Sequence, residues 1–175
     1  MAEALVFYFD DEAERAIRVL WERLERAGVP SLARLGHGQH RPHLTLAMGA
    51  GFPGPVRREL ARELNRIHLP DLWLHTVGTF TTSEDVLMLG AMVDVELLAV
   101  HSAVHDVLAG GVKQPSAYYL PGSWVPHCTL AMGITGDQLV TGFAALRPVP
   151  AIHARISGVG IVDTVSGKVS TLLTR

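Results

Sequence analysis

A repeated octapeptide constrains this chain more than any other feature of its sequence. Residues 42–49 read Pro-His-Leu-Thr-Leu-Ala-Met-Gly, and residues 126–133 read Pro-His-Cys-Thr-Leu-Ala-Met-Gly. Seven of the eight positions are identical at an offset of 84 residues. With roughly a 7% chance of a match at each position, chance produces such a pair in about one chain in a thousand. We infer an internal duplication, with repeats over approximately residues 1–84 and 85–175.

The same offset aligns the segments before each motif. Residues 5–10 fall on residues 89–94, and apolar positions spaced by three and four then predict a helix in both copies. In the first copy Asp11 and Glu14 resemble a capping box. In the second copy Asp94 is the expected N-cap. The two halves therefore begin with the same strand and helix.

The second part of each half also follows one pattern. Helices are predicted over approximately residues 55–67 and 136–146, and strands within residues 73–93 and 152–173. Each half thus reads strand, helix, connection, motif strand, helix, strand. The predicted fold class is α/β (α+β), with two pseudo-symmetric lobes. Each lobe is a mainly antiparallel sheet with helices outside, the motif strands face a central cleft, and the 175 residues form one bilobal domain.

Composition excludes several classes of protein. The single cysteine, Cys128, excludes a disulfide framework and multi-cysteine zinc or iron–sulfur sites. The formal net charge of −2 argues against a protein that coats long duplex nucleic acid. No segment resembles an export signal or a membrane span, so a cytoplasmic protein without membrane partners is expected, with a monomer as the expected state.

The motif places polar and apolar residues on opposite faces of a strand. Because side chains alternate, His43 and Thr45 share one face, and His127 and Thr129 share the equivalent face of the second copy. Packing alone would keep the apolar positions of a duplicated strand, not the imidazole and the hydroxyl. A pair of histidines can exchange protons with a phosphodiester, and threonine hydroxyls can bind its oxygens.

These paired motifs resemble those of the two-histidine (2H) phosphoesterase superfamily, with its 2′-5′ RNA ligase-like proteins and RNA 2′,3′-cyclic phosphodiesterases. The resemblance covers nearly the whole chain. It implies an enzyme that needs no metal or cofactor and opens a 2′,3′-cyclic phosphate, on an RNA end or a nucleotide, to a 2′-phosphate, with reverse 2′-5′ ligation as a further activity. It carries over to His43, Thr45, His127 and Thr129 as catalytic residues. His127 would activate water and His43 would protonate the leaving oxygen, although the near-symmetry leaves these roles interchangeable.

The chain differs from RNA-processing relatives beside the second motif. Those proteins often carry an arginine shortly before it and another just after it, where this chain has Ser123 and Met132. A small cyclic phosphate, such as ADP-ribose 1″,2″-cyclic phosphate, is therefore an alternative substrate. A catalytically silent RNA- or nucleotide-binding module and a metal-binding protein are the alternative functions.

Four further residues are candidates for binding the substrate. His40 and Arg41 precede the first motif and are expected to contact phosphate from a loop at the cleft mouth. Tyr118 and Trp124 precede the second motif and either stack on a ring of the substrate or pack into the core. His37, His40 and His43 are spaced by three, but two glycines and Pro42 disfavour a helix, so a loop is preferred to a metal site.

The remaining polar candidates favour structural roles. His101 and His105 align with Ile17 and Trp21 on an apolar helix face, which predicts a partly buried, hydrogen-bonded pair. Cys128 lies on the core side of its strand, so it is not expected to be a nucleophile. A basic stripe alternates with glutamates and is expected to be a solvated helix face; it comprises Arg57, Arg58, Arg62 and Arg66.

Overall fold

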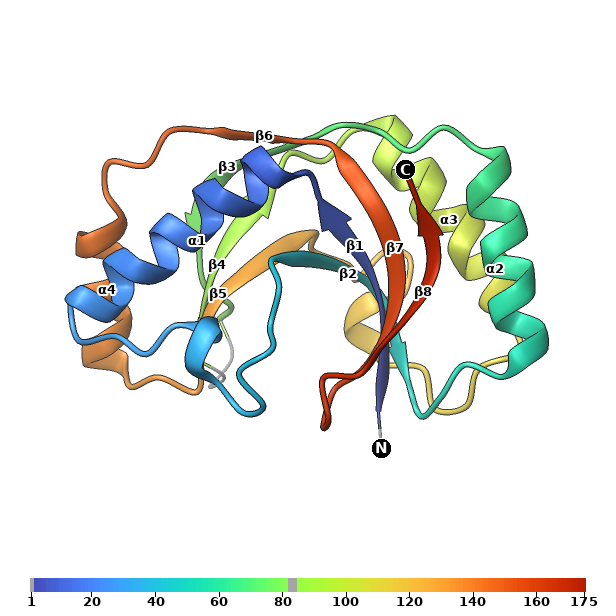
Figure 1. Cartoon of the computed structure of the whole chain (residues 1–175), viewed down its shortest axis with the longest axis horizontal. Helices are drawn as coiled ribbons and strands as arrows, with labels where there is room; N and C mark the ends of the chain where they lie inside the picture. The colour runs from blue at the N-terminus through green and yellow to red at the C-terminus, as the bar shows by residue number, and fades with distance from the viewer. Residues whose placement is uncertain (1, 82–84) are drawn as a thin grey trace.

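A computed structural model describes residues 2–81 and 85–175 of the chain (Figure 1). The strands are β1 (Glu3–Phe9), β2 (His43–Gly49), β3 (Leu72–Gly78), β4 (Val86–Ala91), β5 (His127–Met132), β6 (Ile152–Ala154), β7 (Ile156–Asp163) and β8 (Val169–Thr174). The helices are α1 (Asp11–Arg26), α2 (Gly54–Arg66), α3 (Val95–Leu108) and α4 (Gly136–Leu146), with short 3-10 helices η1 (Leu32–Arg34) and η2 (Ala117–Tyr119). This order confirms the predicted pattern of both halves.

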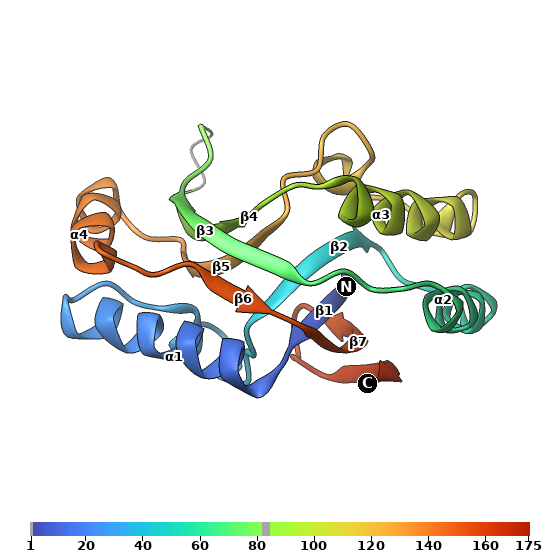
Figure 2. The ribbon, with the colours of Figure 1, turned by 90° about the horizontal axis from the view of Figure 1, so that it is seen from above.

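The strands form two four-stranded sheets, which confirms the predicted two-lobed α+β fold. One sheet has the order β2-β1-β7-β8 and the other the order β5-β4-β3-β6, with antiparallel pairing throughout. Strand β7 of the second half pairs with β1, and strand β3 of the first half pairs with β4. Neither half therefore holds a complete sheet. The motif strands β2 and β5 are the edge strands that meet at the middle of the molecule (Figure 2).

The helices are exchanged between the lobes in the same way. Helix α1 packs beside α4 and against β5 and β6, whereas α3 packs beside α2 and against β2. Each sheet is thus covered on its outer side by one helix from each half (Figures 1 and 2). One large apolar core runs through both lobes because the buried faces of the sheets and helices are continuous, and Ala4, Val6 and Tyr8 form a small second cluster on β1.

The start of α1 corrects one detail of the sequence prediction. The N-cap is Asp10 rather than Asp11: the Asp10 carboxylate accepts hydrogen bonds from the backbone N–H groups of Glu12 and Ala13, each at 3.1 Å. A capping residue must be extended, and Asp10 is extended whereas Asp11 is already helical. In the second half Asp94 caps α3 through Leu97 N at 2.8 Å, as predicted.

Strand pairing also corrects the alignment of the first strands. Leu5 lies opposite Ala47 in one sheet, and Leu87 lies opposite Ala131 in the other. Because Ala47 and Ala131 are 84 residues apart, the strands β1 and β4 correspond at an offset of 82, not 84. The helices still correspond at 84, so the second copy has two extra residues between strand and helix. An even shift keeps the inward and outward positions of a strand unchanged.

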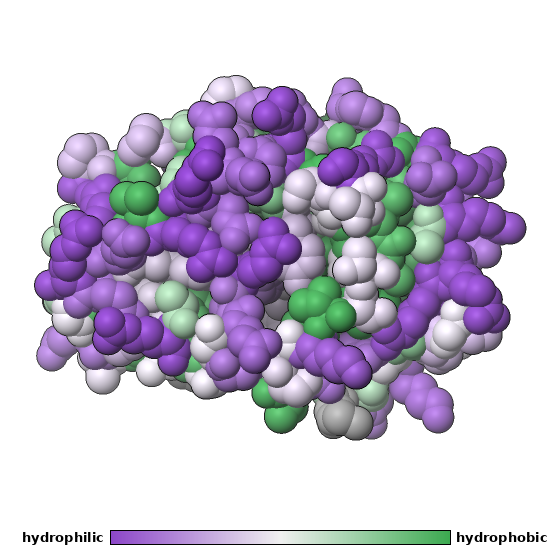
Figure 3. Space-filling view, viewed as in Figure 1, coloured by the Kyte–Doolittle hydropathy of each residue, from purple (hydrophilic) through white to green (hydrophobic). Residues whose placement is uncertain are grey.

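Polar surface covers the outer helices. In Figure 3 hydrophilic side chains lie over α1 and α2, and paler and hydrophobic side chains lie over β7 and β8 between them. Val165 and Val169, which belong to the β7–β8 hairpin, are exposed. Within residues 2–81 and 85–175, no helix has the length and apolar character needed to cross a membrane.

Candidate active site

The two motif strands expose their histidine and threonine on the same face. In β2, Leu44 and Leu46 are buried, whereas His43 and Thr45 are only partly buried. In β5 Cys128 and Leu130 are buried, and the partly buried His127 and Thr129 again alternate with them. The buried face packs into the core beneath the helices. The predicted division of the motif into a polar face and a packing face is confirmed.

Both motif strands carry a β-bulge at the same place. Val6 pairs with Thr45 and Leu5 with Ala47, so Leu46 has no partner on β1. The equivalent shift in the other sheet leaves Leu130 without a partner on β4. A bulge turns two consecutive residues toward one side, and Leu46 and Ala47 are accordingly both buried. The bulge therefore ends the alternation directly after the His-x-Thr segment.

The two histidine rings are oriented by identical hydrogen bonds. His43 Nδ1 lies 2.7 Å from Arg41 O, and His127 Nδ1 lies 2.7 Å from Val125 O. A carbonyl oxygen can only accept, so each Nδ1 carries a proton and donates it. In the neutral ring each Nε2 is then unprotonated and free to act as a base. Burial lowers the pKa of both imidazoles, and the backbone hydrogen bonds oppose that shift without cancelling it.

The motif strands contact each other across the two lobes. Strands β2 and β5 pack together, and the backbone of His43 lies close enough to Cys128 to oppose the rise in the pKa of its thiol. Positive charge on His127 lowers the pKa of His43, so the two imidazoles lie within electrostatic reach of each other. Cys128 is 1% exposed and burial raises the pKa of its thiol to about 12, which agrees with the predicted packing role.

Each motif histidine also meets an aromatic ring. Tyr8 on β1 lies opposite His43 in the ladder and makes an edge contact with it, with ring centroids 6.5 Å apart. Phe80, in the loop after β3, makes the equivalent contact with His127 at 5.1 Å. A Cβ at Gly160 would lie 3.1 Å from Tyr8 Cε2, so this glycine leaves room for the tyrosine ring. Sequence reasoning missed both rings, although Tyr8 lies two residues after Val6 and so shares the face of β1 that Val6, the partner of Thr45, presents.

Arg41 is placed beside the first motif by two contacts. Its guanidinium carbon lies 4.6 Å from the centre of the Tyr8 ring, and its Nη2 lies 2.7 Å from Glu14 Oε2. Glu14 also accepts a hydrogen bond from Arg18 Nη2 at 2.8 Å. The pKa of Glu14 is lowered by these two arginines despite its partial burial. Arg41 is thus a partly exposed cation (47% side-chain exposure) held against the aromatic wall of the candidate site.

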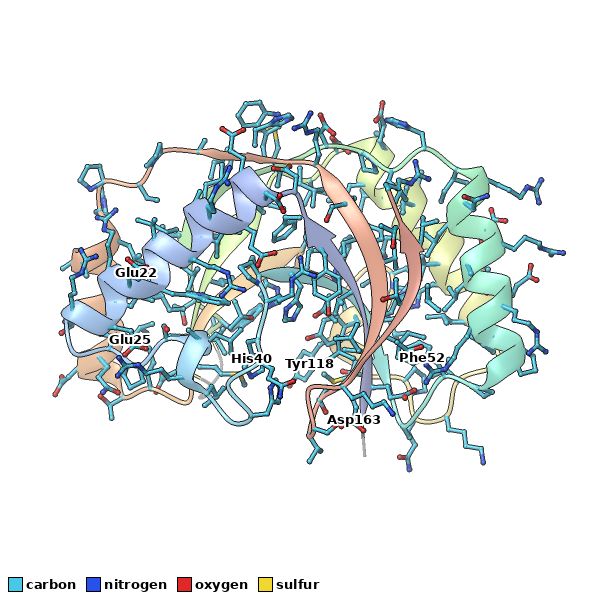
Figure 4. The ribbon with its side chains drawn as sticks, viewed as in Figure 1. Glu22, Glu25, His40, Phe52, Tyr118 and Asp163 are labelled. Atoms are coloured by element: carbon cyan, nitrogen blue, oxygen red, sulfur yellow. The ribbon has the colours of Figure 1, made fainter. Side chains whose placement is uncertain are left out.

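His40, in a loop, and Tyr118, in η2, lie in the lower middle of the molecule in Figure 4. The His40 ring packs against the His37 ring at a tilt of 32°, with centroids 4.2 Å apart, and burial together with His37 lowers the pKa of His40. These two histidines lie outside any helix, as predicted. Tyr118, in η2, is 67% exposed and so presents its ring to solvent. In the described ranges, no three histidine, cysteine, aspartate or glutamate side chains are grouped so that they could hold a metal ion.

Trp124 is engaged on two sides by the protein. Its ring stacks on His101 with centroids 3.9 Å apart and an interplanar angle of 2°, and its Nε1 donates to Thr45 O at 2.9 Å. His101 is 2% exposed, His105 is partly buried, and both are hydrogen-bonded. The predicted partly buried, hydrogen-bonded pair is therefore confirmed. Trp124 therefore contacts the first motif strand although it precedes the second motif.

The arginine stripe of α2 and a cavity beside it lie away from the motif histidines. On α2, Arg62 and Arg66 pair with glutamates of the same helix, which confirms a solvated face for this part of the stripe. Arg57 instead makes a salt bridge to Glu3 at 2.6 Å. A cavity of about 410 Å³ adjoins this pair beyond the far end of β2, and Lys113 and Asp163 complete its rim.

The sequence model of the 2′-5′ RNA ligase superfamily matches residues 9–168. The chain belongs to this superfamily. Both motif strands and the whole candidate site except Tyr8 lie inside the matched residues, whereas β8 and all of β1 but Phe9 lie outside them. Membership places the chain among the two-histidine phosphoesterases, which confirms the family inferred from the repeated motif.

Solved structures share the fold of this superfamily member at low sequence identity. LigT of Escherichia coli has a TM-score of 0.61 and 16% identity, with 97% of this chain and 93% of that chain covered. A structure described as a phosphoesterase has a TM-score of 0.57 and 18% identity, covering 97% and 92%. Usb1 of Kluyveromyces marxianus has a TM-score of 0.50 and 12% identity, covering 98% and 97%. No curated protein sequence matches the chain.

Proposed function

We propose that this protein opens a 2′,3′-cyclic phosphate to a 2′-phosphate without a metal ion. The observation that carries the proposal is the pair of equivalent histidines, each with Nδ1–H bound to a backbone carbonyl and Nε2 left as the reactive nitrogen. One neutral and one protonated imidazole form a general base and a general acid. The two rings come from strands that contact each other, so one phosphate can lie between them.

In the proposed reaction a water molecule attacks the phosphorus and gives its proton to Nε2 of His127. The bond between phosphorus and the 3′-oxygen breaks, and this oxygen takes the proton from Nε2 of the protonated His43. Thr45 and Thr129 donate hydroxyl hydrogen bonds to the non-bridging oxygens, where negative charge increases in the transition state. Replacing the water by a 5′-hydroxyl gives the 2′-5′ ligation by the same transfers.

The substrate is proposed to be an RNA end or a nucleotide with this cyclic phosphate. Arg41 and His40 would approach its phosphate, and Tyr118 would stack on a base or ring. A small cyclic phosphate such as ADP-ribose 1″,2″-cyclic phosphate is the second candidate. It is favoured by Arg41 being already paired with Glu14 and by the absence of arginine at Ser123 and Met132.

A substrate panel tests the proposal. The purified protein is incubated with 2′,3′-cyclic mononucleotides, an RNA oligonucleotide ending in a 2′,3′-cyclic phosphate, a 2′-5′ dinucleotide and ADP-ribose 1″,2″-cyclic phosphate. Products are identified by chromatography and ³¹P NMR. We expect a 2′-phosphate product that also forms in EDTA. Turnover of none of these compounds overturns the proposed function, and a complete loss in EDTA that zinc or magnesium restores overturns its metal independence.

A further inference from the structure

The bulged carbonyl groups of β2 are bound by side chains instead of a neighbouring strand. Trp124 Nε1 donates to Thr45 O at 2.9 Å. His101 Nε2 and His105 Nε2 each lie 3.2 Å from Leu46 O. Strand β2 is an edge strand and Leu46 has no partner on β1, so side chains supply donors at this bulge. The peptide groups that follow His43 are therefore fixed from outside the sheet.

The two imidazoles act as donors to this strand. Leu46 O can only accept, so both Nε2 atoms carry protons in this arrangement. His101 Nε2 is also 2.9 Å from Tyr119 O and is thus shared between two carbonyl groups. The rings of His101 and His105 are 4.4 Å apart, and His101 is 2% exposed. Without these donors the buried carbonyl group would be left unpaired, which costs free energy. A shift of the strand that found it another donor would lower this cost.

Trp124 joins the two motifs through one short segment. Its indole N–H holds the Thr45 carbonyl, and three residues later the same segment reaches His127. Its ring lies flat on His101, which itself binds β2. A displacement of Trp124 would consequently move a support of β2 and the segment that leads into β5 together.

Helix α1 of the first half offers no equivalent of this support. At the helix positions of His101 and His105, α1 has Ile17 and Trp21, both buried. The buried Trp21 Nε1 has no hydrogen-bond partner among the described residues. Histidine at two adjacent turns of α3 is therefore not a general requirement for packing this helix. It matches the particular need of the β2 bulge for donors.

We propose that Trp124, His101 and His105 are positioning residues of the active site, which aim His43 and Thr45 by holding the carbonyl groups of Thr45 and Leu46. The inference rests on the proposed function for its kinetic test. Misplacement of a reacting group by about 1 Å can cost about 100-fold in rate. The support acts on geometry after binding, so kcat is expected to change more than KM.

The first test replaces Trp124 by phenylalanine. Trp124→Phe keeps an aromatic ring against His101 and removes only the N–H donor. We expect kcat for the best cyclic phosphate to fall by about 10-fold or more, with KM within about twofold. The matched control is Trp73→Phe, because Trp73 is half exposed on β3 and contacts His153 outside the site. An unchanged kcat in Trp124→Phe, or an equal loss in Trp73→Phe, overturns the proposal.

The second test compares two replacements of His105. The amide N–H of glutamine can occupy the place of imidazole Nε2–H, whereas leucine fills similar space without a donor. We expect His105→Gln to retain most of kcat and His105→Leu to lose about 10-fold. Equal kcat values for the two variants, or losses that simply follow their melting temperatures, contradict a positioning role.

A spectroscopic measurement separates this inference from the proposed function. ¹⁵N-labelled histidine reports the Nδ1-H tautomer and the pKa of the His43 ring by NMR without any substrate. If the parent turns over no cyclic phosphate, the proposed function fails, and the NMR result decides the inference alone. A changed His43 tautomer ratio or pKa in Trp124→Phe supports positioning. Unchanged His43 signals overturn it.

Discussion

Removing either motif histidine should abolish most of the proposed activity while leaving the fold intact. In His43→Ala or His127→Ala one of the two Nε2 atoms that exchange protons with the substrate is lost. A positioned general acid or base contributes roughly 10²- to 10⁴-fold, which corresponds to about 2.7–5.4 kcal/mol of transition-state stabilisation. The equivalent Nδ1 hydrogen bonds, both 2.7 Å long, predict losses of similar size for the two variants.

The free energy of unfolding should fall much less in these variants than the transition-state stabilisation does. Each ring makes one hydrogen bond to a backbone carbonyl, with a typical net value of about 0.5–1.5 kcal/mol, and one edge contact with an aromatic ring. We therefore expect a drop of a few degrees in melting temperature and an unchanged circular dichroism spectrum. His153→Ala is the matched control, because His153 pairs with Asp71 at 2.9 Å and takes no part in the site.

The double variant adds a stricter requirement. Because the two imidazoles act on one phosphate as a unit, His43→Ala with His127→Ala should lose less than the product of the single losses. The assay is initial-rate kinetics on the best substrate of the panel. A near-normal kcat in either single variant refutes the paired-histidine reasoning. So does a loss of activity that is matched by unfolding.

Further predictions concern pH and the threonines. Burial lowers the pKa of both His43 and His127. Because the reaction needs one neutral and one protonated ring, kcat/KM should peak below pH 6.5. A maximum at pH 7 or above contradicts this prediction. Burial and His105 lower the pKa of His101 from 6.5 to about 4, so the unfolded state binds more protons between these values. The contribution of His101 to the unfolding free energy should therefore be constant above pH 6.5 and fall by about 3 kcal/mol toward pH 4. The total fall, measured by urea titration, should be smaller in His101→Gln than in the parent protein. Thr45→Ala should cost less kcat than loss of a histidine, about 10- to 100-fold, since one hydrogen bond to a charged group is worth about 1.5–3 kcal/mol.

The sequence predicted those features that follow from periodicity. The faces of the motif strands follow from alternation, and α4 begins and ends where its apolar pattern does. The exchange of strands between the halves could not be predicted from the sequence, because it depends on which strand edges are free to pair and not on the local residue pattern. The two extra residues before Asp94 were hidden because an even shift preserves the apolar alternation.

The aromatic rings beside the motif histidines and the β-bulge were missed for different reasons. Phe80 lies in a loop, where no periodicity indicates which way a side chain points. Tyr8 could have been assigned to the open face by its parity on β1. The adjacent apolar pair Leu46 and Ala47, repeated in the second motif, breaks the alternation and was the available signal for the bulge.

The duplicated site is symmetric in its hydrogen bonds and asymmetric in what surrounds them. Opposite His43 in the ladder stands Tyr8, whereas opposite His127 stands Gly90. The glycine has no side chain to pack against His127, and Phe80 from a loop supplies the ring on that side. Behind the strands, donors from α3 hold β2. Because the Nδ1 contacts are the same, the two histidines differ in these neighbours. The neighbours can therefore decide which histidine acts as the acid and which as the base.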